Sequence, residues 1–286
     1  VEKGEQSVLD RPIYALLPDG STGFSLNFAR LAVHRPGYGY AGGLDPHADA
    51  PHPAADGIWR IDLASGQSDL VVSLAELAAR DPKASMQGAW HYLNHIQPSR
   101  CGQRIAFFHI WHKDAKDWEV RLYTCRPDGS DLTCLLDTGF ISHYDWRDDD
   151  TILIWANRPG APARFLLITH QDDAHPSTGS QVPRFDVFGD ASLQEDGHCT
   201  FSPDRQWVLN DTYPDTHQKR TLMLVRAGDA RRIDIARLHS PKSRWWGEIR
   251  CDLHPRWSRD GRQICIDSVH DGSRQMYIVD IGHIIQ

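Results

Sequence analysis

The sequence repeats one short pattern five times: a polar tight turn, followed at once by a short run of apolar residues. Clear copies are Ser202-Pro203-Asp204 before the apolar run 207–209, and Ser258-Arg259-Asp260-Gly261 before the run 264–266. The turns lie near residues 19, 100, 148, 204 and 260. After the first interval they recur about every fifty residues, a period typical of the blades of a β-propeller. Because the inner strands of all blades surround one central channel, such a fold would bring distant residues together at one mouth.

Each repeat is long enough for about four strands separated by turn residues. In the fourth repeat we expect strands at 198–202, 207–211, 221–225 and 232–236, and in the second repeat we expect the last two strands at 120–124 and 132–136. The last repeat has room for three strands only, so it lacks an outer strand. The sequence therefore predicts an all-β protein, a β-propeller of four-stranded antiparallel blades with five blades visible, as a single domain over residues 1–286.

Two ways of closing such a ring remain open, and an open sheet edge makes some closure necessary. Residues 6–9 have the character of an outer strand without a blade, so they could complete the last blade of a five-bladed ring. Alternatively, the chain is the C-terminal part of a larger propeller whose first blades would precede residue 1.

Three stretches interrupt the strand pattern. Residues 34–56, rich in Pro, Gly, Ala and His, predict a long loop, and residues 171–196 predict another irregular connection. Residues 73–82 predict a short helix, with Ser73 as its N-cap and Pro82 just beyond its end.

Composition narrows the function classes. The formal charge of −7 argues against a general nucleic-acid surface, and no apolar run approaches the roughly 20 residues that cross a membrane. The first residues have no signal-peptide core and no initiator Met, so we expect a cytoplasmic protein, or a periplasmic one if an N-terminal segment is missing. The six cysteines form no CxxC pair, which favours reduced thiols over a zinc site.

Histidines are unusually frequent, with 16 in 286 residues. His95, His143, His198 and His254 each lie just before or within the first strand of a separate repeat. Because first strands line the channel of a propeller, we expect these four side chains to converge near one mouth. Neutral imidazoles bind transition metals, whereas imidazolium and guanidinium groups hold carboxylates, so the set suits either task. The alternative for each residue is a hydrogen bond that ties neighbouring blades together.

Other polar residues could assist at this mouth. Tyr144, Tyr213, Arg158 and Arg250 offer proton transfer or carboxylate binding, and His91, Gln97 and Asp252 offer further ligands. For Arg250, anion binding and a salt bridge to Glu248 or Asp252 are equally open. Aspartates near the strands are more often turn-fixing or blade-linking groups than catalysts; these are Asp145, Asp211, Asp252 and Asp267. The histidines of the loops read as polar surface residues; these are His34, His47, His52, His170, His175 and His217.

Several of these segments resemble the propeller polysaccharide lyases. The residues that carry the resemblance are Asn94-His95-Ile96-Gln97, Ser142-His143-Tyr144-Asp145-Trp146, Gly197-His198 before Phe201-Ser202-Pro203-Asp204, and Asp252-Leu253-His254-Pro255-Arg256-Trp257-Ser258. The likeness is greatest to the oligogalacturonate lyases and covers most of residues 88–282. Its Ser-Pro-Asp-Gly turns are shared with all TolB-like and WD40-like propellers, whereas the Asn-His-x-Gln and Gly-His elements are more specific.

The resemblance implies a seven-bladed propeller, of which this chain would be the C-terminal part. It also implies a divalent, manganese-like metal at the channel mouth, with His198 and His254 as two of its ligands. In related lyases a Tyr transfers the proton beside a His and an Arg, parts that Tyr144, Arg158 and His91 or His95 could play. This chain departs from the family in its last repeat, where Arg250, Cys251 and a single His254 replace a tighter cluster of ligands.

The sequence therefore favours a lyase that cleaves uronate-containing oligosaccharides by β-elimination at the propeller mouth. Its partner would be an acidic oligosaccharide rather than nucleic acid or membrane, with a protein partner left open. The expected catalytic residues are Tyr144, Arg158, His95 and Arg250; the expected substrate-binding residues are His91, Gln97, His143 and Tyr213; the expected metal ligands are His198 and His254. Two alternatives are a non-catalytic TolB/WD40-like propeller that binds a protein or glycan, and the regulatory propeller of a larger enzyme. The lack of a GxSxG motif argues against a complete prolyl-peptidase-like enzyme.

Overall fold

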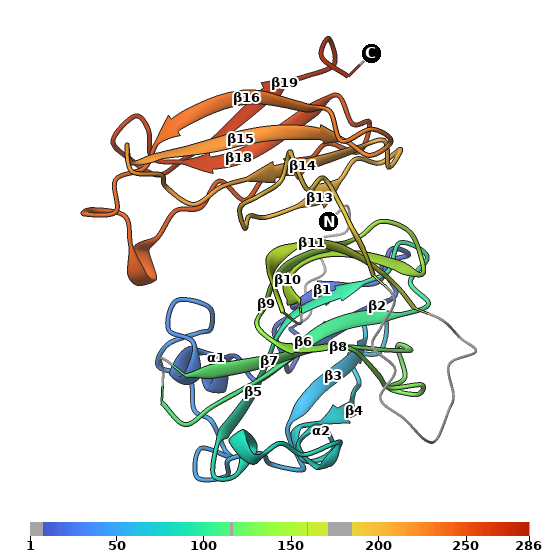
Figure 1. Cartoon of the computed structure of the whole chain (residues 1–286). Coiled ribbons are helices and arrows are strands. Elements are labelled where there is room, and N and C mark those ends of the chain that lie inside the picture. The colour runs from blue at the N-terminus through green and yellow to red at the C-terminus, as the bar shows by residue number, and fades with distance from the viewer. Residues whose placement is uncertain (1–7, 115–116, 159, 171–184, 286) are drawn as a thin grey trace. The chain divides into compact units, whose positions relative to one another are not determined.

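The computed structural model describes residues 8–114, 117–158, 160–170 and 185–285. These residues form antiparallel sheets with little helix, in two compact units, Val1–Cys134 and Leu135–Gln286 (Figure 1). In the described part of the chain, four sheets have four strands and the last has three, and every sheet follows chain order from one edge to the other. The all-β, four-stranded antiparallel organisation predicted from the repeats is thus confirmed.

The first unit contains two sheets and two short helices among its described residues. One sheet consists of β1 (Ala15–Leu16), β2 (Thr22–Ser25), β3 (Gly57–Asp62) and β4 (Ser68–Ser73). The other consists of β5 (Trp90–Pro98), β6 (Ile105–His112), β7 (Trp118–Cys125) and β8 (Thr133–Gly139), and residues 135–139 of β8 are counted in the second unit. Helix α1 (Phe28–His34) follows β2, and α2 (Leu74–Ala79) and the 3-10 turn η1 (Ala84–Met86) precede β5.

The second unit contains the other three sheets. The first consists of β9 (Ile141–Trp146), β10 (Thr151–Arg158), β11 (Ala161–Thr169) and β12 (Phe185–Val187). The second consists of β13 (Thr200–Phe201), β14 (Trp207–Asp211), β15 (Lys219–Arg226) and β16 (Arg232–His239). The 3-10 turn η2 (Gly247–Ile249) leads to the last sheet, which consists of β17 (Arg256–Trp257), β18 (Gln263–Ser268) and β19 (Gln275–Asp280).

The repeated turns have a common chemistry. In the fourth repeat the Ser202 hydroxyl donates to Asp204 at 2.6 Å and accepts from the backbone N–H of Trp207 at 3.0 Å. In the fifth repeat the Ser258 hydroxyl donates to Asp260 at 2.6 Å and accepts from the N–H of Gln263 at 3.0 Å. Short Asp and Ser side chains therefore satisfy turn backbone that the ladder leaves unpaired, which explains why the Ser-x-Asp pair recurs in these two hairpins.

Alternate side chains of a strand point to opposite sides of its sheet, and sheet β13–β16 carries apolar side chains on both faces. Val208 and Met223 pack with residues of β10 and β11 in one core, whereas Leu209 and Leu222 pack with residues of β18 in another. The central sheet of the second unit is therefore held on both sides, and side chains at the end of β14 emerge in two directions.

The sequence predictions for individual elements have mixed outcomes. Strand β14 has the predicted bounds, β13 is shorter than the predicted 198–202, and β15 and β16 are each three residues longer than predicted. Helix α2 begins at the predicted cap, where Ser73 accepts from the N–H of Glu76, and within the described residues the last sheet has three strands, as predicted. Helix α1, capped by Asn27, and strand β12 were not predicted. Of the outer strand predicted at 6–9, residues 6 and 7 lie outside the described residues, and Val8 and Leu9 form no strand.

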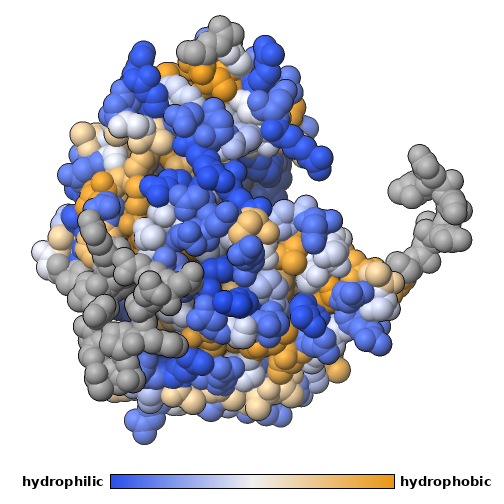
Figure 2. All heavy atoms as spheres, turned by 90° about the vertical axis from the view of Figure 1, so that its right-hand side faces the viewer, coloured by the Kyte–Doolittle hydropathy of each residue, from blue (hydrophilic) through white to orange (hydrophobic). Residues whose placement is uncertain are grey.

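The surface is mostly hydrophilic on the face shown in Figure 2, with hydrophobic side chains in smaller groups. No cysteine forms a disulfide among the described residues, in agreement with the expected thiols. The helices described are at most seven residues long, and none has the length and apolarity needed to cross a bilayer.

The prediction that the loop histidines are surface residues is wrong in part. His34 is half-buried, with its ring 5.5 Å from that of Trp90 and its Nδ1 3.1 Å from Nε2 of His112. His170 is 7 % exposed, whereas His52 and His217 are exposed as expected. His34 differs because it ends helix α1, a helix that the loop prediction omitted; His175 lies outside the described residues.

Candidate functional site

Three histidines from three different sheets of the second unit lie ring to ring. His143 belongs to β9, His198 precedes β13, and His254 precedes β17. The ring centroids of His143 and His198 are 4.0 Å apart, and those of His198 and His254 are 3.8 Å apart. The three histidines occupy equivalent positions, before or within the first strand of their sheets. The repeat predicted that residues at such positions would converge. Imidazoles at this spacing can act on one small ligand together.

Asp211, the last residue of β14, fixes two of these histidines. Its carboxylate accepts from the backbone N–H of His198 at 2.7 Å, from ring Nδ1 of His198 at 2.8 Å, and from the backbone N–H of His254 at 3.2 Å. Asp211 is fully buried, and an unpaired carboxylate there would be costly. The site is therefore organised around a buried acid, which the sequence suggested only as a blade-linking residue.

Each partner of this pair shifts the pKa of the other. Burial would raise the pKa of Asp211, but His198 and its hydrogen bonds hold it well below the ordinary value. Burial would lower the pKa of His198, but the Asp211 carboxylate reverses this and raises it. Because Nδ1 of His198 is held by Asp211, its other nitrogen, Nε2, is the one turned to a ligand.

His143 and His254 are biased toward the neutral form. Burial, together with the neighbouring His198, lowers the pKa of His143, although Asp196 lies 3.0 Å from its Nδ1 and opposes the shift. Desolvation and the same neighbour lower the pKa of His254 to about 4. Neutral imidazoles can accept a proton or bind a metal, which a charged ring cannot.

Asp252 lies beside the stack with two arginines. Arg220, fully buried on β15, reaches its Oδ1 at 2.6 Å, and Nε of Arg250 donates to its Oδ2 at 2.7 Å. The two uses left open for Arg250 are thus resolved in part, since it is paired with Asp252. The guanidinium of Arg250 also lies over the ring of Tyr213, 5.5 Å from its centroid. Positive charge is therefore concentrated at one side of the histidines.

The backbone of His254 is in the left-handed region, with φ at 43°. This conformation is uncommon outside glycine and is found preferentially at functional sites. The hydrogen bond from its N–H to Asp211 holds it there. The conformation therefore links the position of the His254 ring to the same carboxylate that orients His198.

A divalent metal fits the donor set of this site. His198, Asp252 and His254 each offer one ligand atom, and these atoms all lie within 4.8 Å of one another. Nε2 of His198 is 3.9 Å from Oδ2 of Asp252, which is within the about 4.2 Å that two ligands of one ion can span. Imidazole nitrogens with a carboxylate, backed by a second carboxylate on His198, form a common arrangement around transition metals.

The other predicted residues of the second unit lie at different distances from the stack. Tyr213 is close, with its ring centroid 6.3 Å from that of His143 and 6.4 Å from that of His198. Tyr144 follows His143 directly on β9, so its side chain leaves the opposite face of that strand. Arg158 ends β10, where its Nε donates to the carbonyl of Pro162 in the hairpin. The roles predicted for all three remain predictions.

His91, His95 and Gln97 belong to β5 in the first unit. His91 is fully buried, with its Nδ1 2.8 Å from Nε2 of His109. His95 has φ at 55° and packs on Phe108, with ring centroids 4.9 Å apart. Their predicted catalytic and substrate-binding roles are not tested by this geometry.

Two residues of the site had no functional assignment in the sequence. Asp196 orients His143, and Arg220 neutralises Asp252. Asp196 lies two residues before His198, in an Asp-Gly-His segment. This closeness to a predicted site histidine was the sequence feature that could have identified it. Arg220 lies in an ordinary polar turn-to-strand segment, and nothing in the pattern indicates that it is buried.

No family model matches the chain, and no curated protein does. Solved structures do match. TolB from Acinetobacter baumannii superposes with a TM-score of 0.54 at 10% identity, over 95% of this chain and 52% of TolB. An oligogalacturonate lyase in complex with manganese has a TM-score of 0.50 at 15% identity, over 93% of this chain and 75% of the lyase. An acylaminoacyl peptidase in complex with a chloromethyl ketone has a TM-score of 0.51 at 12% identity, over 98% of this chain and 39% of the peptidase.

These similarities show a propeller fold of the TolB and oligogalacturonate lyase kind. The chain spans about half of the length of TolB and three quarters of the lyase. The number of blades in a complete ring, and the seven predicted from the resemblance, remain predictions.

Proposed function

We propose that this protein is a lyase that cleaves uronate-containing oligosaccharides by β-elimination at the stack of His143, His198 and His254. The observation that carries the proposal is the meeting of three imidazoles from three sheets, with Arg250 at their side. The set supplies what the reaction needs: a neutral base, a place for a cation and a fixed positive charge. An acidic oligosaccharide is the partner that this chemistry suits.

His198, Asp252 and His254 would hold a divalent metal, which supplies positive charge against the uronate carboxylate and so makes the neighbouring C5 proton more acidic. Asp211 keeps His198 oriented for this task, and Arg220 keeps Asp252 in place. Arg250 lies where it can contact the same carboxylate while it remains paired with Asp252.

The proton transfers are assigned to His143 and Tyr213. His143 is held by Asp196 at Nδ1, and its lowered pKa leaves Nε2 able to accept the C5 proton at neutral pH. As that proton leaves, the C4–C5 double bond forms, the C4–O bond breaks, and its electron pair goes to the leaving oxygen. The Tyr213 hydroxyl donates the proton that this oxygen takes. The proton on His143 then passes to solvent, and solvent returns a proton to Tyr213.

The test uses the full chain with a panel of oligouronides and added Mn²⁺. Turnover creates an unsaturated uronate, which is followed by its ultraviolet absorbance. We expect His198→Ala and His254→Ala to abolish the signal, and His217→Ala to retain it, since His217 is an exposed turn residue of the same unit. No absorbance change on any uronide, with divalent metals supplied, would overturn the proposal.

A second candidate function is a non-catalytic propeller that binds an acidic glycan. It is favoured by the pairing of both Asp252 oxygens with arginines, which leaves that carboxylate less available to a metal. On this reading His198→Ala weakens glycan binding in calorimetry, and the unaltered chain binds the glycan without turning it over. Turnover by the unaltered chain would exclude it.

A further inference from the structure

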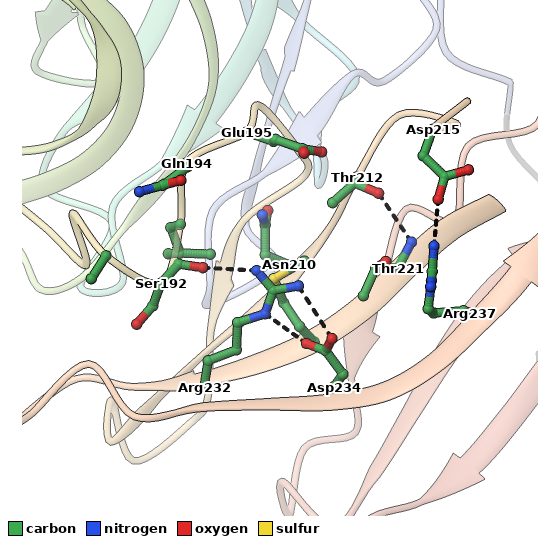
Figure 3. A pocket seen from close by; sticks show the side chains of 13 residues that line it. Ser192, Gln194, Glu195, Asn210, Thr212, Asp215, Thr221, Arg232, Asp234 and Arg237 are labelled. Carbon is green, nitrogen blue, oxygen red and sulfur yellow. Dashed lines mark hydrogen bonds and ion pairs between the residues drawn. The ribbon is translucent and has the colours of Figure 1, made fainter. Parts of the chain in front are cut away.

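A second polar cavity lies in the second unit, on sheet β13–β16 (Figure 3). Its walls come from β14, β15 and β16 and from residues 191–195, and its volume is about 310 Å³. That value is at the lower end of the range for small-molecule sites, roughly 300–1,000 Å³. Leu193 and Met223 give it an apolar floor, and polar side chains form the rest of its lining. A small ligand with both polar and apolar faces would fit such a lining.

Asn210 is the feature that indicates a ligand. It is fully buried, and in the described part of the chain neither its amide oxygen nor its amide nitrogen has a hydrogen-bond partner. Figure 3 shows its side chain in the middle of the residues that line the cavity. An unpaired buried amide costs about 1–3 kcal/mol, so a molecule that supplies both an acceptor and a donor would be bound preferentially.

The charges around Asn210 disfavour an anion. Arg232 is paired with Asp234 at 2.6 Å and donates to the carbonyl of Ser192 at 3.0 Å, and Arg237 is paired with Asp215. Both cations are thus already balanced. Glu195 makes no ion pair with any residue that the structure describes, so the cavity carries an excess of negative charge. This excess of negative charge would repel a uronate.

The geometry points to this cavity as a binding site for an uncharged, hydroxyl-rich small molecule of the monosaccharide or polyol class. Each hydroxyl can both donate and accept a hydrogen bond, which matches the unpaired oxygen and nitrogen of the Asn210 amide. The carbon face of a sugar packs on the apolar floor. Asn210 and Asp211 are consecutive on β14, so their side chains leave opposite faces of the strand, and this site is separate from the histidine stack.

The test is a titration with D-glucose, D-galactose and myo-inositol, followed by ligand-observed saturation-transfer NMR on the full chain. We expect saturable binding of at least one of them, and weaker binding of D-galacturonate when the stack is disabled by His198→Ala. Asn210→Leu should weaken that binding by about tenfold, the worth of a lost pair of hydrogen bonds. Asn157→Leu is the matched control, because Asn157 is an exposed residue of the same unit, and it should bind like the unaltered chain.

Asn210→Leu is expected to fold, because replacing an unpaired buried amide by an apolar side chain of similar size is neutral or stabilising. No saturable binding of the neutral compounds would overturn the inference, and so would tighter binding of galacturonate by His198→Ala or unchanged binding by Asn210→Leu. If the cavity holds only water, none of the neutral compounds will bind saturably. His198→Ala should leave this binding unchanged, so failure of the proposed lyase activity and failure of this site are distinguishable.

Discussion

The carboxylate of Asp211 accepts a hydrogen bond from Nδ1 of His198 at 2.8 Å, inside a part of the second unit where the acid has no contact with solvent. This pair decides which nitrogen of His198 is available, and through the N–H of His254 it also sets the position of the next ring. A carboxylate that holds a metal-binding histidine in this way usually strengthens its affinity for the ion.

Asp211→Asn should therefore weaken metal binding. The amide cannot stabilise the His198 ring as a carboxylate does, and it can hold either tautomer. We expect an affinity for Mn²⁺ or Zn²⁺ that is lower by about 10–100-fold, measured by isothermal titration calorimetry. Asp229→Asn, which alters an exposed ion pair of the same unit, should leave the affinity unchanged. Equal affinities for the Asp211 variant and the unaltered chain would show that no metal uses His198.

Gly197 is predicted to tolerate no side chain. A Cβ at this position would lie 1.8 Å from the carbonyl oxygen of Asp211 and 2.9 Å from Nδ2 of Asn210. Since the first atom is strand backbone, relief needs movement of β14 itself. Gly197→Ala should thus destabilise the fold by about 1–3 kcal/mol and lower the Tm by several degrees.

Gly228→Ala is the control for this substitution, because a Cβ there meets nothing within 4 Å. Differential scanning calorimetry of the two variants gives the comparison. Equal melting temperatures would mean that Gly197 lies farther from the backbone of β14 than the structure shows.

The sequence was sufficient for the parts of the fold that follow a short repeat. Strand β14 and the Ser-x-Asp turns at Asp204 and Asp260 were predictable because each turn residue has a local hydrogen-bonding task. The convergence of His143, His198 and His254 followed from equivalent positions in successive sheets. Helices α1 and α2 are both too short for a clear period. Helix α2 was recognised by its Ser73 cap, whereas the Asn27 cap of α1 was overlooked.

The parts of the site that the sequence did not predict depend on contacts between distant segments. Arg220 is separated from Asp252 by 32 positions, and only the packing of two sheets turns both side chains to one point. Asn210 looks like any polar residue at the end of a strand, and its importance comes from burial without a partner. Neither property has a local signature in the amino-acid sequence.

Acid should destabilise the protein through the buried histidines of the first unit. Burial, with His52 and other neighbours, lowers the pKa of His91 to about 4, and burial lowers the pKa of His109 well below its ordinary value. Between pH 6.5 and 4 the unfolded chain gains protons that the folded chain does not, so the free energy of unfolding falls as the pH falls. His91 alone accounts for about 3 kcal/mol over this window.

Urea titrations at a series of pH values measure this slope. The double variant His91→Gln, His109→Gln should show a smaller loss of stability between pH 6.5 and 4, relative to its own value at neutral pH. His217→Gln, an exposed residue, should keep the original slope. A slope that is the same in all three proteins would contradict the assignment.

The identity of the proton donor separates Tyr144, which the sequence analysis expected to be catalytic, from Tyr213, which it expected to bind substrate. The ring of Tyr213 lies 6.3 Å from that of His143, whereas Tyr144 leaves the opposite face of β9. With an active uronide as substrate, Tyr213→Phe should lower kcat by about 10²–10⁴-fold with little change in KM, because it removes one hydroxyl and keeps the ring beneath Arg250. Tyr144→Phe should stay within a few-fold of the unaltered chain. The reverse result, a large loss for Tyr144→Phe alone, would place the reaction on the other face of the strand and remove His143 as its base.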